Sequence, residues 1–289
     1  MLSVDRDALR RYIERSVHDL PALPAAVAKV VEITESPEAS SAALNQVISS
    51  DQALSAKVLR VVNSAYYGLS AQVSTTNHAI VILGMQQIRN LVLSMAAMSL
   101  VRNRSAAMGQ MHVQFWRHAF GTAKGAERIA RIKHLPVSEI DRCFIGALLH
   151  DIGMLFLYST FTDLYTRTLL DAKDNGVPLH VAEEKLLGIN HTEVGRMLAT
   201  AWKFPEAIRK LIGEHHDPQD GEFNATRASI QAADFFANAA GYSPLNAPVP
   251  PMLPEVKAWL DMTDEEEQAV VEYIGEKIRE AEELFGLLV

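Results

Sequence analysis

The sequence has few of the residues and patterns that would indicate other fold classes or other cellular compartments. It contains one cysteine, Cys143, so no disulfide can form within the chain, and we expect a buried thiol in a reducing cytoplasm. Glycine accounts for only 15 of the 289 residues, and no convincing run of alternating apolar and polar residues is present. These absences argue against sheets and favour helices almost throughout.

Positive charge is also scarce. The chain has 27 Lys and Arg residues against 35 Asp and Glu residues, which gives a formal net charge of −8. This balance argues against a protein that is drawn electrostatically to nucleic acid or to a membrane surface. Nucleic acid is therefore a poor default partner, although a local basic patch is compatible with these numbers.

The sequence lacks an uninterrupted apolar run of membrane-spanning length. Its most apolar window, residues 80–101, is interrupted by Gln86-Gln87 and by Arg89-Asn90, which indicates a buried core helix. The N-terminus, Met1-Leu2-Ser3-Val4-Asp5-Arg6, is charged from the start and predicts no secretory signal. We therefore expect a cytoplasmic protein with no membrane association.

Apolar residues make up 48% of the chain, enough for a substantial core. We predict an all-α fold in three parts: an N-terminal helical bundle (1–101), a second bundle (102–242), and a proline-rich connector with an acidic C-terminal helix (243–289). The charged stretch Arg102-Asn103-Arg104-Ser105 marks the first boundary. A first helix should end by residue 20, and further helices are expected at about 25–34, 41–48, 52–63, 77–83, 85–101, 113–133, 136–158, 163–174, 179–187, 192–202, 205–214, 223–240 and 263–285.

Two of these helices, at about 41–48 and 52–63, are separated by Ser49-Ser50-Asp51, in which Asp51 is a good N-cap. Such a pair is either a DNA-binding helix-turn-helix or an ordinary packing unit. Because the second helix offers only Lys57 and Arg60 as cations, we favour the packing unit.

The chain is organised around His150 and Asp151, which follow the apolar run Phe144-Ile145-Gly146-Ala147-Leu148-Leu149. Burying two ionisable side chains without partners is costly, so either a hydrogen-bond network or a metal ion should meet them. Adjacent residues on a helix diverge by about 100°. The pair could therefore bind one ion together or reach two neighbouring ions.

Further candidate ligands adjoin apolar helical stretches in the second half of the chain: His118, His191, His215, His216 and Asp234. A single helical histidine is usually a hydrogen-bonded or surface residue, but the joint pattern favours a site. Imidazole nitrogens with bridging carboxylates suit iron, manganese, zinc or cobalt. Two such ions would bind a bridging hydroxide and orient a phosphoryl group. No ligand role is assigned to His18, His78, His112, His134 and His180.

Short motifs follow one another in a specific order along the chain. In the first half they are Leu20-Pro21-Ala22-Leu23-Pro24, Ile48-Ser49-Ser50-Asp51-Gln52-Ala53-Leu54, Asn63-Ser64-Ala65-Tyr66-Tyr67-Gly68 and Ala79-Ile80-Val81-Ile82-Leu83-Gly84. In the second half they are Phe115-Trp116-Arg117-His118, Ala147-Leu148-Leu149-His150-Asp151-Ile152-Gly153, His191-Thr192-Glu193-Val194-Gly195, Trp202-Lys203-Phe204-Pro205 and His215-His216. With this set the chain resembles the HDOD domain proteins, a bacterial branch of the HD superfamily, over about residues 15–240.

The resemblance implies an all-helical fold in which an N-terminal helical bundle packs on an HD-like bundle. It makes seven residues the counterparts of the ligands that hold two metal ions in the related HD-GYP phosphodiesterases: His118, His150, Asp151, His191, His215, His216 and Asp234. The expected cofactor is one or two divalent transition-metal ions, with iron favoured and manganese or zinc also suited.

The chain departs from the phosphodiesterase pattern in two places. The lysine that usually follows the His-Asp-Ile-Gly run is Met154, and no Gly-Tyr-Pro element follows His216, where the chain reads Asp217-Pro218-Gln219-Asp220-Gly221-Glu222-Phe223. Met154 cannot supply a cation to a substrate phosphate. HDOD proteins are generally regarded as regulatory or signalling modules without demonstrated hydrolysis, which agrees with these departures.

We therefore predict a cytoplasmic signalling or regulatory protein that binds metal in its HD-like half and acts through protein partners. The alternative is a metal-dependent phosphohydrolase acting on a nucleotide or another phosphodiester, with Asp151 as the catalytic positioning group or base. A nucleic-acid-binding module is the third class. Both metal-binding hypotheses require His118, His150, Asp151 and Asp234 to converge within a few ångströms.

Overall fold

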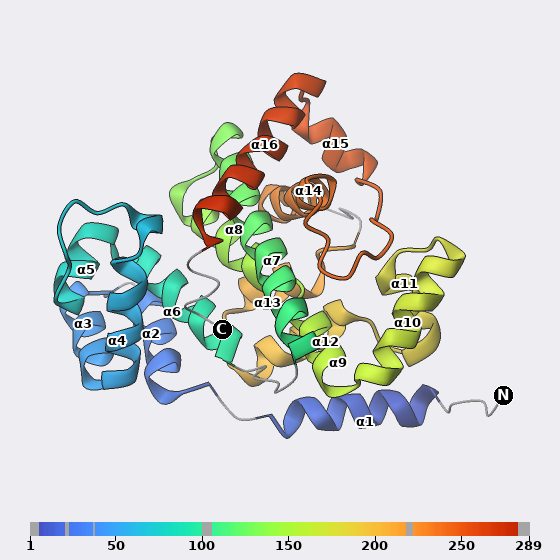
Figure 1. Cartoon of the computed structure of the whole chain (residues 1–289), viewed down its shortest axis with the longest axis horizontal. Coiled ribbons are helices and arrows are strands. Elements are labelled where there is room, and N and C mark those ends of the chain that lie inside the picture. Colours follow the sequence, from blue (N-terminus) through green and yellow to red (C-terminus); the bar gives the residue numbers. More distant parts are fainter. Residues whose placement is uncertain (1–5, 21–22, 37, 100–105, 218–221, 283–289) are drawn as a thin grey trace. The chain divides into compact units, whose positions relative to one another are not determined.

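The computed structural model describes residues 6–20, 23–36, 38–99, 106–217 and 222–282, and Figure 1 shows its helices. Within these ranges the chain is all-α, as predicted, and contains no strand. Internal contacts group the chain into unit 1, Met1–Pro21 with Asn103–Ile278, and unit 2, Ala22–Arg102 with Arg279–Val289. The three-part division stays a prediction, and its boundary at 102–105 lies outside the described residues.

Unit 2 holds a run of short helices: α2 (Ala25–Glu35), α3 (Ser41–Ser50), α4 (Gln52–Val62), the 3-10 turn η1 (Ala65–Tyr67), α5 (Thr76–Leu83) and α6 (Met85–Ser99). Asp51 caps α4 as predicted, because its carboxylate accepts a hydrogen bond from the backbone N–H of Leu54. The chain bends by 115° between α5 and α6. Gly84 stands at the bend with φ +82°, a backbone conformation that favours glycine.

Unit 1 contains α1 (Arg6–His18), α7 (Ala106–Ile132), α8 (Val137–Leu149), α9 (Ile152–Thr160), α10 (Thr162–Asn175), α11 (Leu179–Leu187), α12 (His191–Ala201), α13 (Glu206–Gly213), α14 (Ala225–Ala239), α15 (Pro254–Leu260) and α16 (Asp264–Glu280). Helices α7, α8 and α14 pack closely against one another and build its core. Phe115 and Trp116 on α7 and Phe236 on α14 are buried there, and this packing fixes the helices that carry the candidate ligands.

Helix α1 packs against α11 and α12 of unit 1, although residues 22–102 separate it from that unit in the sequence. Ile13 and Val17 are buried. The Arg10 guanidinium donates hydrogen bonds to the Glu193 carboxylate at 2.6 Å and to the Gly188 carbonyl at 2.8 Å. The second bundle is therefore completed by a helix that sequence order places in the first.

The helix predicted at 136–158 is interrupted. Helix α8 ends at Leu149, α9 begins at Ile152, and His150 and Asp151 form the turn between them. Asp151 has φ −94° and ψ 12°, and its side chain caps no backbone N–H of α9. His150 keeps helical backbone angles, φ −53° and ψ −42°, whereas Asp151 departs from them, and the Asp151 carboxylate is available to partners outside α9.

The connector and the ends of the long helices also differ from expectation. Residues 243–253, here called the proline segment, are irregular as predicted, but the unexpected helix α15 starts at Pro254, a residue whose fixed φ suits the first helical turn. Helix α7 begins at Ala106 rather than near 113, and α16 ends at Glu280, with residues 283–289 outside the described ranges.

Helices α9 and α12 approach each other closely beside the turn at residues 150–151, and this contact fixes how the two helices are aligned. A Cβ atom on Gly153 of α9 would lie 2.0 Å from the carbonyl oxygen of His191 and 2.6 Å from the backbone nitrogen of Gly195, both on α12. No side chain fits between these backbones. Glycine at position 153 is therefore what allows His191 to stand beside Asp151.

One described helical stretch, Val137–Thr160, is long and apolar enough to cross a membrane, but 83% of its apolar window is buried inside the fold. Together α5 and α6 also pass that test, but they are sharply bent. Such burial of Val137–Thr160 is typical of core helices.

Candidate metal centre

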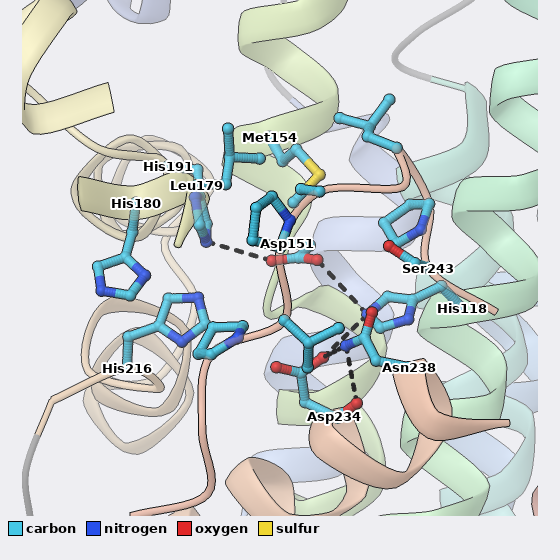
Figure 2. Close-up of a pocket in the computed structure, with 16 residues that line it drawn as sticks. His118, Asp151, Met154, Leu179, His180, His191, His216, Asp234, Asn238 and Ser243 are labelled. Atoms are coloured by element: carbon cyan, nitrogen blue, oxygen red, sulfur yellow. Dashed lines mark hydrogen bonds and ion pairs between the residues drawn. The ribbon is translucent and has the colours of Figure 1, made fainter. Parts of the chain in front are cut away.

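The structure brings the seven predicted ligands together in unit 1, from five places in the chain. They are His118 on α7, His150 and Asp151 in the turn between α8 and α9, His191 at the start of α12, His215 and His216 directly after α13, and Asp234 on α14. Figure 2 labels His118, Asp151, His191, His216 and Asp234 among them. Residues more than 110 positions apart thus meet at one point, where their side chains are mostly buried.

Asp151 lies at the centre of this cluster. Its Oδ2 is 3.5 Å from Nε2 of His118 and 3.2 Å from Nε2 of His150. Its Oδ1 is 3.3 Å from Nε2 of His191 and 3.5 Å from Nε2 of His215. Each carboxylate oxygen therefore faces a different pair of histidines, which is the arrangement of a carboxylate that bridges two ions.

Asp234 belongs to the first of these two groups. Its Oδ1 lies 3.2 Å from Nε2 of His118 and 3.8 Å from Nε2 of His150. The candidate ligand atoms of His118, His150 and Asp151 all lie within 4.8 Å of one another, so one ion can reach one atom of each residue. Two imidazoles and two carboxylates can thus surround one position.

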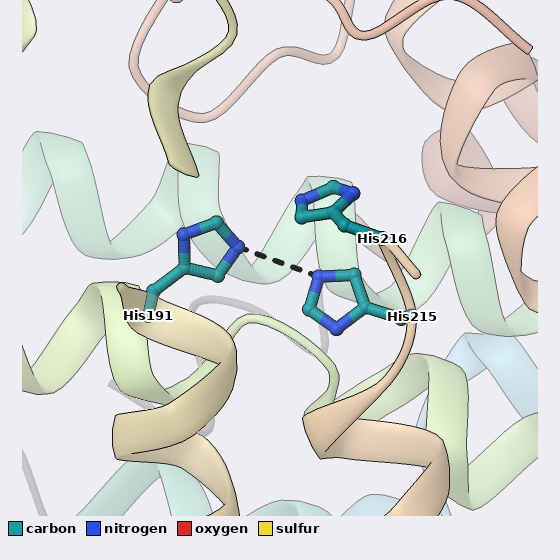
Figure 3. A group of neighbouring side chains, drawn as sticks. All are labelled: His191, His215 and His216. Atoms are coloured by element: carbon teal, nitrogen blue, oxygen red, sulfur yellow. Dashed lines mark hydrogen bonds between the residues drawn. The ribbon is translucent and has the colours of Figure 1, made fainter. Parts of the chain in front are cut away.

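The second group consists of His191, His215 and His216 (Figure 3). Nε2 of His191 is 3.4 Å from Nε2 of His215, and the His215 and His216 rings lie 4.2 Å apart between centroids. With Oδ1 of Asp151, these three imidazoles offer four donors to a second position. Mixed nitrogen and oxygen donors of this kind suit divalent transition metals, whereas an all-oxygen set would suit calcium or magnesium.

The outer nitrogens of four histidines are held by oxygen acceptors. Nδ1–H of His118 donates to the carbonyl of Tyr242 at 3.0 Å, that of His150 to Ala147 at 2.6 Å, and that of His215 to Ile212 at 2.8 Å. With the proton on Nδ1, the lone pair of Nε2 points into the cluster. Such outer hydrogen bonds fix the tautomer and orientation that metal ligation requires.

Glu183 on α11 performs this task for His191, and sequence reasoning assigned it no role. The Glu183 side chain is fully buried. Its Oε2 accepts hydrogen bonds from Nδ1–H of His191 at 2.7 Å and from the backbone N–H of His191 at 2.8 Å, while its Oε1 accepts one from the Tyr165 hydroxyl. A buried carboxylate with three donors is well satisfied and holds the ring firmly.

Opposing effects set the protonation of the cluster. Burial lowers the pKa of His150, but the Asp151 and Asp234 carboxylates and the Ala147 carbonyl together outweigh it and raise that pKa to about 9. Burial raises the pKa of Asp151, yet His150, His215 and His191 together hold it well below its usual value. Burial together with His215 and His191 keeps the pKa of His216 well below its usual value, so His216 is a neutral imidazole suited to ligation.

A cavity of about 40 Å³, here called the metal pocket, opens beside the cluster. Its walls include His118, Asp151 and Asp234 on one side and residues 243–250 of the proline segment on the other. Met154 and His180 also line it (Figure 2). The sequence assigns His180 no ligand role, but its ring stacks on that of His216 with centroids 4.4 Å apart. Nothing in the sequence around Leu179 and His180 predicts this contact.

The comparisons with known proteins agree with this architecture. Residues 20–218 match the model of the HDOD domain. An uncharacterized protein of Treponema pallidum (strain Nichols) is 25% identical over 201 residues, which cover 70% of this chain and 38% of that protein. The chain therefore spans well under half the length of this curated relative.

Two solved structures share the fold. A protein of Shewanella amazonensis SB2B, provisionally named a phosphohydrolase, superposes with a TM-score of 0.72 at 24% identity and covers 96% of this chain and 98% of its own. A protein of Marinobacter aquaeolei VT8, provisionally named a signal transduction protein, gives a TM-score of 0.78 at 19% identity and covers 100% of this chain and 67% of its own. At these identities the likeness is one of fold.

Proposed function

The chain belongs to the HDOD family, and from that premise we propose that it is a cytoplasmic signalling protein whose metal centre controls its contacts with protein partners. The centre holds two divalent transition-metal ions, with iron favoured and manganese or zinc also suited. The name of the Marinobacter protein supports a signalling role, and the buried Cys143 thiol is in keeping with a reducing compartment.

One observation carries the proposal. The two oxygens of Asp151 face two separate histidine groups, each within 3.5 Å. In a hydrogen-bond network, one pair of histidines would be enough to satisfy the carboxylate. Two neighbouring ions, by contrast, call for a carboxylate that bridges them. The residues for the first ion are His118, His150, Asp151 and Asp234, and those for the second are Asp151, His191, His215 and His216.

Metal analysis tests the centre directly. The full chain, purified anaerobically without chelator, should carry close to two metal ions per molecule by inductively coupled plasma mass spectrometry. The His150→Ala variant should lose at least one of them. His112→Ala is the matched control, since it removes another buried histidine, on α7 and outside the cluster. A metal-free wild-type protein would overturn the proposal and leave a buried hydrogen-bond network.

A metal-dependent phosphohydrolase is the second candidate. The bridged pair of positions suits it, because two ions a few ångströms apart can bind a hydroxide and orient a phosphoryl group. The Shewanella protein carries a name of this class. In such an enzyme Asp151 would hold the reacting group in place, and Asp234 would border the substrate from α14.

Met154 weighs against catalysis. It is buried and lines the metal pocket at the position where the related phosphodiesterases carry a lysine, so no ammonium group can offset charge that builds on a phosphate. A screen of metal-loaded protein on phosphomonoesters and phosphodiesters separates the two candidates. Turnover that disappears in His150→Ala would replace the signalling proposal, and bound metal without turnover would favour it.

A further inference from the structure

A second cavity adjoins the metal pocket. This side pocket has a volume of about 170 Å³. His180, His216, Asp234 and Pro250 line both cavities, so they form the border between them. The two cavities are therefore neighbours within unit 1.

The two cavities differ in size. The residues that line the side pocket alone are the apolar Pro178, Phe235, Pro251, Met252 and Leu253 and the polar His215 and Gln231. An apolar cavity of about 150 Å³ is enough to bind benzene. The side pocket thus has room for one six-membered ring, while the metal pocket of about 40 Å³ leaves room for little more than a single small oxyanion.

Charge limits the ligand as well. Among the described residues that line either cavity there is no Lys or Arg. The metal ions are then the only strong attraction for an anion, and they lie at one end. A second phosphate would sit against Phe235 and the proline segment as an unpaired buried charge, which is costly.

From these observations we propose that the centre binds a phosphomonoester, with its one phosphate group at the metal pocket and a ring-sized apolar body in the side pocket. The proposal rests on the proposed function, because it needs the metal ions to hold the phosphate, and it names the class of small molecule that would signal through the centre. Phosphodiesters with two nucleosides and compounds with a second phosphate are excluded by volume and charge.

His180 is the polar group that this chain contributes at the border. Its Nδ1 is buried and has no hydrogen-bond partner among the described residues. The ring is held by stacking on His216 with an interplanar angle of 25°. A phosphate or ester oxygen at the border would complete it.

Calorimetric titration of the Mn²⁺-loaded full chain tests the proposal with two probes, phenyl phosphate and inorganic phosphate. Burial of the ring should make phenyl phosphate bind about tenfold more tightly or better. Met252→Trp fills the side pocket and should abolish this advantage while leaving the affinity for inorganic phosphate and the Mn²⁺ content unchanged. Val137→Trp, at an exposed position on α8, is the control for adding an indole.

The outcomes are distinct. Equal affinity of the wild-type protein for the two probes would refute binding of the ring in the side pocket and leave the metal centre unaffected. So would tighter binding of phenyl phosphate that persists in Met252→Trp. Failure to take up Mn²⁺, measured on the same samples, overturns the metal centre and this proposal with it. His180→Phe keeps an aromatic ring on His216 and should weaken phenyl phosphate; unchanged affinity would remove His180 from the ligand site.

Discussion

The substitution Gly153→Ala should empty the metal centre without replacing any ligand. The new Cβ would lie 2.0 Å from the carbonyl oxygen of His191, whereas Cβ atoms in real proteins stay at least 3.0 Å from such neighbours. Helix α12 must therefore move away from α9 by roughly 1 Å or more. Metal-to-ligand distances tolerate deviations of only about 0.2 Å, so the group around His191 can no longer share an ion with Asp151.

The cost in stability should be moderate. Overpacking against backbone costs about 1–3 kcal/mol, and replacing a helical glycine with alanine returns up to about 1 kcal/mol. The variant should thus remain folded in the metal-free state. Metal content measured by mass spectrometry and unfolding in urea of the metal-free protein separate the loss of the site from the loss of the fold.

Gly121→Ala is the matched control. Its Cβ would meet Cδ1 of Ile278 at 2.6 Å and Cγ2 of Ile274 at 3.1 Å, which are ends of flexible side chains on α16. This variant tests overpacking in the same unit, should lose no more stability than Gly153→Ala, and should keep its metal. Full metal content in Gly153→Ala would refute the argument from the helix approach. Loss of metal in both variants would show that general destabilisation is sufficient.

Three further predictions concern single side chains. Glu183→Gln should weaken metal affinity by about 10- to 100-fold in competition with a chromophoric chelator, while Glu184→Gln on the exposed face of α11 should not change it. Burial raises the pKa of the Cys143 thiol from 9.0 to about 12, so the folded chain keeps a proton that the unfolded chain releases above pH 9. The stability contributed by this thiol should fall as pH rises from 9, by about 2 kcal/mol at pH 10.5, in urea titrations compared with Cys143→Ala; a parallel pH dependence in the two proteins would contradict it. Asn190→Ala removes the N-cap of α12 and should cost about 1 kcal/mol in the same assay.

Much of the fold follows from local signals in the sequence. Helix starts such as Asp51 and stops such as Gly84 depend on a few neighbouring residues, and both were predictable. The break at His150 and Asp151 was not, because an apolar run continues on both sides of it. Neither was the grouping of α1 with unit 1, which depends on contacts such as Arg10 with Glu193, 183 positions away.

The candidate site shows the same division. Six of its seven residues lie in the ordered set of motifs, and Asp234 was predicted from its apolar helical stretch and the family resemblance. The structure brings the seven together, but whether they bind metal is still to be measured. Glu183 was missed because a glutamate on a helix usually faces solvent. A signal was present: Glu183 is spaced four residues from both Leu179 and Leu187, so it falls on the apolar stripe of α11. A carboxylate on such a stripe needs a buried donor, and His191 supplies one.

The place of α1 bears on how the chain folds during synthesis. Its buried face, with Ile13 and Val17, has no surface to cover until α11 and α12 have been made, so the helix must wait for most of the protein while residues 22–102 form their own unit. Two of the three chain crossings between the units, those at 21/22 and 102/103, lead to elements that serve the cluster. One leads from α6 to α7, which carries His118, and the other leads from α2 back to α1, whose Arg10 holds Glu193 two residues beyond His191. The covalent chain therefore links unit 2 directly to an element beside each of the two histidine groups.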